Sequence, residues 1–457
     1  MPRSPRSPRS PRSLRSTALP LLLIAALLTA PLPLRAQELP ADLPQRLDRI
    51  LAAAYPADGP GAVALVAQKG QVLLRKGYGM ANLELAVPMQ PDMVFRVGSI
   101  TKQLTAMAIL QLVEAGRLAL DDDLHRFLPD FPTHGQKITL ENLLTHTSGI
   151  KNYTDLPIWQ RTAKEDRPPS QVLAELREQP ADFAPGERWQ YSNSGYLLLG
   201  AILEKVTGES YAAWMSEHLL KPLGMTRSSF ADTSVVLPGR VPGYEGPPDH
   251  LRNALFLSMA YPYPDGFLLS TVDDLARWDR ALAAGTLVRR DLQERMFTPF
   301  RLRDGRSTNY GYGWWLWTYE GHRVAEHTGL LNGYRAEILR LPDDGLLIVL
   351  LTNHHDHQPL PDTLAAEMAA LALGKPLAER RPVHLDPLLL ERYAGVYRID
   401  PRTVRTITRE GDHLYSQRSG APRLELLPAS ETEFFYRETM DRLRFLVDAR
   451  GKVTGLS

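Results

Sequence analysis

Ser99 and Lys102 stand three residues apart at the start of a long apolar segment. Residues Thr101 to Ala115 are apolar nearly all round and end at Gly116, which predicts a buried helix carrying both side chains on one face. A serine hydroxyl becomes a nucleophile when a base takes its proton, and burial can lower the pKa of a lysine enough for that task. The alternative interpretation is an N-cap serine beside a solvated lysine, because Ser-x-x-Lys also arises by chance.

Two further motifs follow in the chain. Tyr191-Ser192-Asn193 lies in a polar loop before an apolar helix, where tyrosine could relay a proton and asparagine could bind an amide. His327-Thr328-Gly329 falls at the end of an expected strand, and its glycine would let a substrate approach the backbone closely. Taken singly, the first motif is as well explained by a helix-capping loop and the second by a strand-end turn.

The order of the three motifs resembles that of the serine beta-lactamases and penicillin-binding proteins, most nearly the class C and DD-peptidase branch. The resemblance covers roughly residues 45 to 375. Four other stretches also fit it: Phe95–Gly98, Leu143–Gly149, Leu268–Trp278 and Tyr310–Trp314.

The resemblance implies a role for each motif residue. Ser99 is the expected nucleophile, and Lys102 and Tyr191 are the proton-transfer pair. The substrate is expected to contact Asn193, His327, Thr328 and Gly329. The backbone N–H groups of Ser99 and Leu330 would form the oxyanion hole.

One position departs from the pattern, because many members have lysine where this chain has His327. A histidine with an ordinary pKa of about 6.5 is mostly neutral at pH 7, so it offers a weaker anchor for a substrate carboxylate. Strong beta-lactam hydrolysis is therefore not expected. A peptidase remains compatible, since the family includes DD-peptidases with histidine here, and so does an esterase.

The surrounding pattern predicts an α/β fold, in which an antiparallel sheet flanked by helices carries an inserted helical block. Apolar runs around Lys69-Gly70 predict a hairpin near the start of the unit. Later strands are expected at Arg323–Glu326, Tyr334–Leu341 and Leu346–Thr352. Helices are expected at Asp42–Ala54, Thr139–Leu144, Gln171–Arg177, Gly195–Val206, Tyr211–Leu220, Val272–Leu282 and Leu364–Leu373, with a capping box from Thr271 to Asp274.

We expect four parts: a signal peptide at 1–36, a hydrolase domain at 37–375, a linker at 376–387 and a small all-β module at 388–457. The module resembles the lipocalin-like domain appended to many such hydrolases, and its short last strand suggests truncation. The signal peptide is predicted from five early arginines, the apolar run Ala18–Leu28 and the small-residue site Leu34-Arg35-Ala36. The alternative is an uncleaved membrane anchor.

Composition limits the remaining possibilities. The 457 residues carry a formal net charge of +1, which gives no indication of nucleic-acid binding, and loss of residues 1–36 removes six arginines and no acid. The absence of cysteine excludes disulfides and a cysteine nucleophile. We expect an exported, periplasmic or extracellular enzyme without stable membrane insertion, cofactor or metal. Its expected partner is a small peptide, ester or amide, with peptidoglycan as a candidate.

Two competing interpretations of the whole chain stay open at this point. A non-catalytic module could retain the fold and recognise the cell wall. An unrelated α/β hydrolase could use one of the histidines, although no Gly-x-Ser-x-Gly elbow occurs. The run Asn353–His357 could bind metal, but we interpret it as a polar loop. Trp314, Trp315 and Trp317 could line a cleft, but such aromatic runs are more typical of a protein core. His146 could orient the site or cap a helix.

Overall fold

The computed structural model describes residues 41–230, 234–259, 263–374, 382–399, 404–418, 423–436, 442–448 and 450–456. The expected signal peptide at 1–36 lies outside the described residues, as do positions 376–381 of the expected linker. Among the described residues, no helix is long and apolar enough to cross a membrane.

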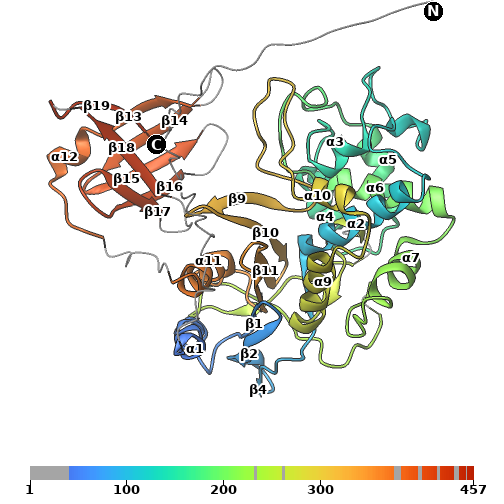
Figure 1. Cartoon of the computed structure of the whole chain (residues 1–457), viewed down its shortest axis with the longest axis horizontal. Helices are drawn as coiled ribbons and strands as arrows, with labels where there is room; N and C mark the ends of the chain where they lie inside the picture. The colour runs from blue at the N-terminus through green and yellow to red at the C-terminus, as the bar shows by residue number, and fades with distance from the viewer. Residues whose placement is uncertain are drawn as a thin grey trace, which may run out of the picture. The chain divides into compact units, whose positions relative to one another are not determined.

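A six-stranded antiparallel sheet forms the centre of the hydrolase domain (Figure 1). Its strands lie in the order β2-β1-β12-β11-β10-β9, so the hairpin that opens the domain pairs with the strands that close it. The bounds are β1 Ala62–Gln68, β2 Gln71–Tyr78, β9 Trp315–Tyr319, β10 His322–Leu331, β11 Tyr334–Leu341 and β12 Leu346–Thr352. This arrangement confirms the predicted α/β fold with an antiparallel sheet and an inserted helical block.

Helices cover both faces of this sheet. Helices α1 (Leu43–Ala54) and α11 (Pro361–Ala372) pack together on one side, whereas α9 (Val272–Ala284) packs against β1 and β12 on the other (Figure 1). Every residue of β12 is buried, as a strand covered on both faces requires.

The inserted block packs around helix α2 (Thr101–Glu114), and every α2 side chain from Thr101 to Leu110 is buried. This confirms the buried helix predicted after Ser99. The other helices are α3 Leu140–Leu144, α4 Pro157–Thr162, α5 Pro169–Arg177, α6 Asn193–Thr207, α7 Tyr211–Met215 (continued by a π-helical turn, Ser216–Leu220), α8 Tyr263–Gly266 and α10 Arg290–Met296. Short strands are β3 Met80–Asn82, β4 Val87–Pro88, β5 Phe95–Arg96, β6 Tyr244–Glu245, β7 Arg252–Asn253 and β8 Leu269–Ser270.

One local prediction was wrong and another was confirmed only in part. His327-Thr328-Gly329 does not end a strand, because β10 continues to Leu331 and stays paired with β11 from Ala325 to Leu331. The capping box at Thr271 is half formed: the Thr271 side chain accepts from the Asp274 backbone N–H, but the Asp274 carboxylate has other partners.

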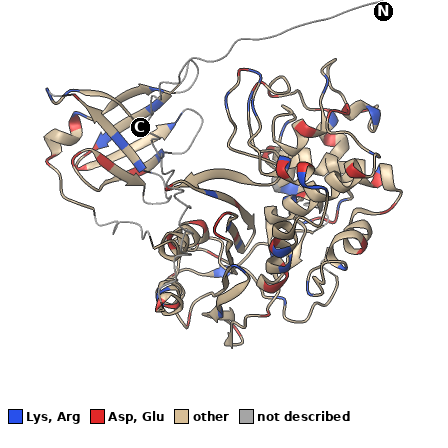
Figure 2. Ribbon diagram, viewed as in Figure 1, with Lys and Arg blue, Asp and Glu red and all other residues tan. Residues whose placement is uncertain are grey.

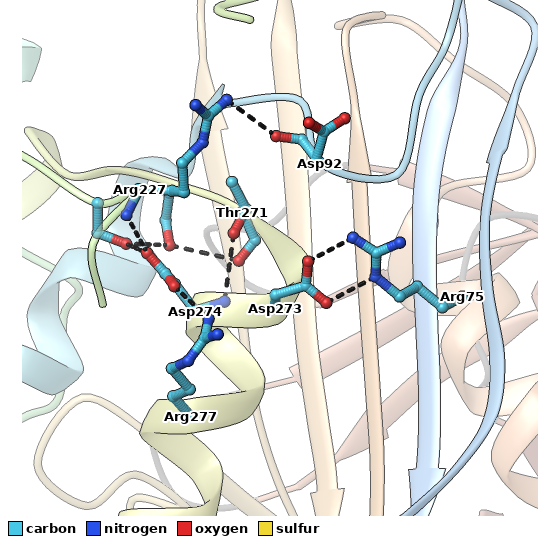
Figure 3. Close-up of polar contacts among 9 residues, drawn as sticks. Arg75, Asp92, Arg227, Thr271, Asp273, Asp274 and Arg277 are labelled. Atoms are coloured by element: carbon cyan, nitrogen blue, oxygen red, sulfur yellow. Dashed lines mark hydrogen bonds and ion pairs between the residues drawn. The ribbon is translucent and has the colours of Figure 1, made fainter. Parts of the chain in front are cut away.

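Those partners tie α9 to the segment before it (Figure 3). The fully buried Asp274 carboxylate accepts hydrogen bonds from the Arg227 backbone N–H at 2.9 Å and the Ser228 hydroxyl at 2.8 Å, and it pairs with Arg277. The neighbouring Asp273 forms a more exposed pair with Arg75 of β2. A buried carboxylate is stable only when such donors surround it, so Asp274 fixes the start of α9.

The C-terminal part is a small all-β domain with its own core. Seven antiparallel strands follow one another in chain order and fit the expected lipocalin-like module loosely. The bounds are α12 Pro387–Glu391, β13 Gly395–Arg398, β14 Val404–Glu410, β15 His413–Arg418, β16 Arg423–Pro428, β17 Glu433–Tyr436, β18 Arg442–Val447 and β19 Val453–Leu456. Acidic and basic residues are interspersed over the described helices and strands (Figure 2), in keeping with the small net charge.

Candidate active site

Ser99 lies in a single 3-10 turn, Gly98–Ile100, directly before α2. The turn begins with a left-handed residue, Gly98, whose φ is +54°. The Thr101 hydroxyl donates to the Gly98 carbonyl and accepts from the Leu268 N–H, which joins the turn to the segment before α9. The Ser99 hydroxyl is therefore presented at the N-terminus of a buried helix, where backbone N–H dipoles favour negative charge.

Lys102 is the second residue of α2, is fully buried and makes three contacts. Its Nζ lies 3.1 Å from the Ser99 hydroxyl oxygen, 2.8 Å from Asn193 Oδ1 and 2.8 Å from the backbone carbonyl oxygen of Asp265. A neutral amine has two N–H groups and one lone pair. The two carbonyl oxygens can accept the two N–H groups, which leaves the lone pair directed at the Ser99 hydroxyl.

Burial lowers the pKa of Lys102 to about 8, although the Asp265 carboxylate opposes this by favouring the ammonium form. Asp265 is itself buried in the short helix α8, and burial raises its pKa to about 6. The Tyr153 hydroxyl donates to Asp265 Oδ2 at 2.9 Å. Near pH 8 the lysine is thus close to half deprotonated and can act as a base.

Tyr191 is the second group beside the serine. Burial raises its pKa above the ordinary value of 10, and a side-chain hydrogen bond with Ser99 acts in the opposite direction. The Lys102 Nζ lies 4.9 Å from the centre of the Tyr191 ring. Tyr191 therefore stays a neutral phenol at physiological pH and is available as a proton donor. It lies next to Lys102, whose pKa is lowered whereas that of Tyr191 is raised.

His146 packs against Tyr191, with ring centroids 4.3 Å apart. It is buried, its φ is +58°, and its Nδ1 accepts from the Ser192 backbone N–H at 3.2 Å. Burial and the nearby charge of Lys102 lower its pKa well below 6.5, so it is neutral. Its position favours orientation of the Tyr191 loop over helix capping.

Asn193 is the first residue of α6 and joins Lys102 to the turn at Tyr153–Asp155. Its N–H donates to Asn152 Oδ1 at 3.0 Å, and its Nδ2 lies 3.4 Å from the Thr154 hydroxyl. The side chain expected to bind an acyl amide is thus also a hydrogen-bond partner of the lysine.

His327 is 1% exposed and is held at both ring nitrogens. Its Nδ1 lies 2.7 Å from the Thr328 carbonyl oxygen, and its Nε2 lies 2.9 Å from the Tyr310 hydroxyl. Its ring centroid is 6.2 Å from that of Tyr191.

Beyond Glu326 the edge of β10 is no longer paired with β9. Strand β9 pairs with β10 only from His322 to Glu326, and in the described part of the chain no other strand pairs with the following residues on that side. Thr328 is exposed, and Leu330 is 47% exposed. An extended substrate could add to this edge through backbone hydrogen bonds.

The two expected oxyanion groups lie close together because of two glycines. A Cβ atom added to Gly98 would lie 2.7 Å from the Leu330 nitrogen, and one added to Gly329 would lie 1.9 Å from the Val97 carbonyl oxygen. The turn carrying Ser99 and the strand carrying Leu330 are therefore in direct backbone contact.

Sequence reasoning missed Asp265 and Tyr153, and it noted the stretch containing Tyr310 without assigning that residue to the site. Tyr-Pro-Asp-Gly at 263–266 has the composition of an ordinary turn, so nothing local marks the aspartate as a neighbour of Lys102.

Other sequence candidates lie elsewhere. Asn353 binds backbone groups at Gly61, Met80 and Ala81, and His354 bonds to the Gly246 carbonyl. Within the described ranges, no group of three His, Asp or Glu side chains is arranged to hold a metal ion. Trp314 is buried against Phe297. A cavity of about 800 Å³ lies between β9, β10, β11 and α11, and no site residue lines it.

Known proteins resemble this chain over most of its length. A family model described as Beta-lactamase matches residues 48–373, and one described as a domain of unknown function (DUF3471) matches residues 379–457. Penicillin-binding protein 4* of Bacillus subtilis (strain 168) is 29% identical over 403 residues, which are 83% of this chain and 89% of that protein. The D-aminopeptidase of Gluconobacter oxydans (strain 621H) is 31% identical over 355 residues, 75% of this chain and 65% of that protein.

A solved structure shows the same fold over most of the chain. The octameric penicillin-binding protein homologue from Pyrococcus abyssi superposes with a TM-score of 0.66 at 28% identity, covering 89% of this chain and 96% of that chain.

Proposed function

The chain belongs to the beta-lactamase family, and from this premise we propose that it is a serine hydrolase that forms an acyl-enzyme on Ser99. Its proposed substrates are D-alanyl peptides, as for a DD-carboxypeptidase, or small esters and amides. The observation that carries the proposal is the 3.1 Å contact between the buried Lys102 Nζ and the Ser99 hydroxyl oxygen.

The proposed reaction begins when Ser99 Oγ attacks the substrate carbonyl carbon and its proton passes to the neutral Lys102 Nζ. The carbonyl oxygen becomes an anion between the N–H groups of Ser99 and Leu330. When the tetrahedral intermediate collapses, the bond to the leaving amine or alcohol breaks, and the Tyr191–Lys102 pair returns the proton to that group. Water then attacks the acyl-serine, releases the acid and restores the Ser99 hydroxyl.

The relatives support the choice of substrate class. One similar protein is named a D-aminopeptidase and two others are named for penicillin binding, so amides next to a D-residue are the first candidates. Beta-lactams are weaker candidates, because the position occupied by lysine in many members holds His327 here.

Intact-mass measurement tests the proposal. After incubation with a fluorophosphonate, the protein should gain the mass of one phosphonyl group, and Ser99→Ala should gain none. Ser307→Ala, in an exposed loop, is the matched control and should label like the original protein. Incubation with a penicillin, then a panel of esters, D-alanyl peptides and a chromogenic cephalosporin, would rank the substrates. No adduct with either reagent would instead favour a cell-wall recognition module without turnover.

We also propose that residues 1–36 direct export to the periplasm or medium, on the basis of their basic start and apolar run. Fractionation of cells expressing the full chain tests this. An exported protein would be found outside the cytoplasm with its N-terminus near residue 37, and a full-length cytoplasmic protein would contradict the proposal.

A further inference from the structure

His327 uses both of its ring nitrogens for bonds within the protein. A carbonyl oxygen can only accept, so the 2.7 Å contact with the Thr328 carbonyl requires a proton on Nδ1. In the neutral ring, Nε2 is then an acceptor, and the Tyr310 hydroxyl 2.9 Å away is the donor that satisfies it.

The surroundings oppose a second proton on this ring. His327 is buried, and the groups facing it are the Lys102 amine, the neutral His146 and the phenols of Tyr191 and Tyr310. Burial and the positive charge of Lys102 lower the pKa of His327 to about 3. The ring thus stays neutral throughout the physiological range.

Lys102 cannot serve as a substitute anchor for a carboxylate. Its Nζ is fully buried and already faces three oxygen atoms, those of Ser99, Asn193 and Asp265. An ammonium has three N–H donors, so even in its charged form each donor has a partner.

We propose that Tyr310 is a positioning residue that holds His327 as a neutral ring, and that the site therefore selects substrates whose leaving side is uncharged, such as amides and esters, over those ending in a free carboxylate. This rests on the proposed function of Ser99 and narrows its substrate class. A carboxylate entering beside His327 would lose its water, and neither the neutral His327 ring nor the fully partnered Lys102 amine could replace it, which costs more than the same entry by an amide.

Histidine tautomers are the first test, and they do not depend on activity. In protein labelled with ¹⁵N-histidine, two-bond ¹H–¹⁵N correlation spectra should show His327 as the neutral Nδ1–H form from about pH 8 down to about pH 5. The signal is assigned by its loss in His327→Gln. An Nε2–H tautomer, or titration of His327 with a midpoint near 6.5, would overturn the proposal.

Substrate preference is the second test, with one D-alanyl peptide supplied either as its C-terminal amide or with a free carboxylate. We expect kcat/KM to favour the amide by at least about tenfold in the original protein. Tyr310→Phe removes the hydroxyl that donates to Nε2. The His327 ring then loses one of the two bonds that fix its orientation and could turn an N–H toward a substrate carboxylate, so the preference for the amide should fall several-fold. An original protein that favours the free carboxylate would contradict the proposal.

Tyr312→Phe is the matched control. It removes a hydroxyl from the same Tyr-Gly-Tyr-Gly stretch, but Tyr312 bonds to Glu141 and not to His327. The preference and the His327 tautomer should be unchanged in this variant, and an equal loss of preference in both variants would refute the role of Tyr310.

If Tyr310→Phe does not fold, His327→Lys is the second variant: restoring a cation should lower the preference for the amide, and an unaltered preference would count against the proposal. Failure of fluorophosphonate labelling would reject the function of Ser99, whereas the tautomer measurement judges His327 alone.

Discussion

The Lys102 Nζ lies 2.8 Å from the backbone carbonyl oxygen of Asp265, a residue whose own carboxyl group is buried and interacts electrostatically with the same lysine. The main chain of Asp265 therefore positions Lys102, the proposed base, and the side chain of the same residue raises the pKa of that lysine. Removal of the charge of Lys102 or of Asp265 should change the pH dependence of the acylation rate in a predictable direction.

The acylation rate should rise with pH through the pKa of Lys102. A protonated lysine has no lone pair to accept the Ser99 proton, so acylation is slow well below pH 8 and levels off above it, given a pKa of about 8. The rate of fluorophosphonate labelling from pH 6 to 10 measures this. Lys102→Ala should slow labelling by about 1,000-fold, whereas Lys76→Ala, a lysine on β2 paired with Asp48, should leave it unchanged. A folded Lys102→Ala protein that labels normally would refute the assignment.

Asp265→Asn should move that midpoint to lower pH. The Asp265 carboxylate raises the pKa of Lys102, and near pH 8 it is ionised because its own pKa is about 6. Loss of the negative charge should lower the midpoint by about 1 pH unit. Asp155→Asn, an exposed neighbour in the turn beside Asn193, is the control and should not move it. An upward movement would show that the carboxylate acts in some other way.

Replacement of His146 should disturb the orientation of the Tyr191 ring more than it lowers the stability of the protein. His146→Ala removes the ring packed 4.3 Å from that of Tyr191 and should reduce kcat by about 10- to 100-fold through loss of orientation. His146→Asn should recover part of this rate, because asparagine tolerates a positive φ and can accept from the Ser192 N–H. His218→Ala, the half-exposed histidine stacked on Trp214, is the matched control. Equal rates for all three variants would leave His146 with a packing role only.

Asp274→Ala should be strongly destabilising. It leaves the Arg227 N–H and the Ser228 hydroxyl without their buried acceptor, which costs about 3 kcal/mol of unfolding free energy. Asp273→Ala breaks the partly exposed pair with Arg75 and should cost about 0.5 kcal/mol (Figure 3). Urea unfolding of both variants measures the difference, and a similar loss in each would contradict the argument.

Local geometry accounts for one part of the candidate site, the proximity of Ser99 and Lys102. Ser99 and Lys102 are joined by one helical turn, so their proximity follows from a spacing of three residues. The grouping of Tyr191 and His327 with them rested on the resemblance to known hydrolases, because nothing in a single sequence reports a contact across the fold.

The residues that sequence reasoning missed reach the site only when elements distant in the chain pack together. Asp265 lies in a stretch that has the composition of a turn, and its importance arises only when α8 packs against α2. The full length of β10 was missed because Gly329 interrupts the apolar pattern. The structure shows why glycine stands there: the Val97 carbonyl occupies the space that a side chain would need.

This close approach also bears on how such an enzyme could change its substrates over time. The separation between the N–H groups of Ser99 and Leu330 is set where two stretches of main chain meet, at Gly98 and Gly329, and not by the shape of any side chain. Replacement of the exposed residues around the entrance can therefore alter which molecules enter while the machinery for acyl transfer keeps its dimensions. A scaffold built in this way can acquire a new specificity without first having to rebuild its chemistry.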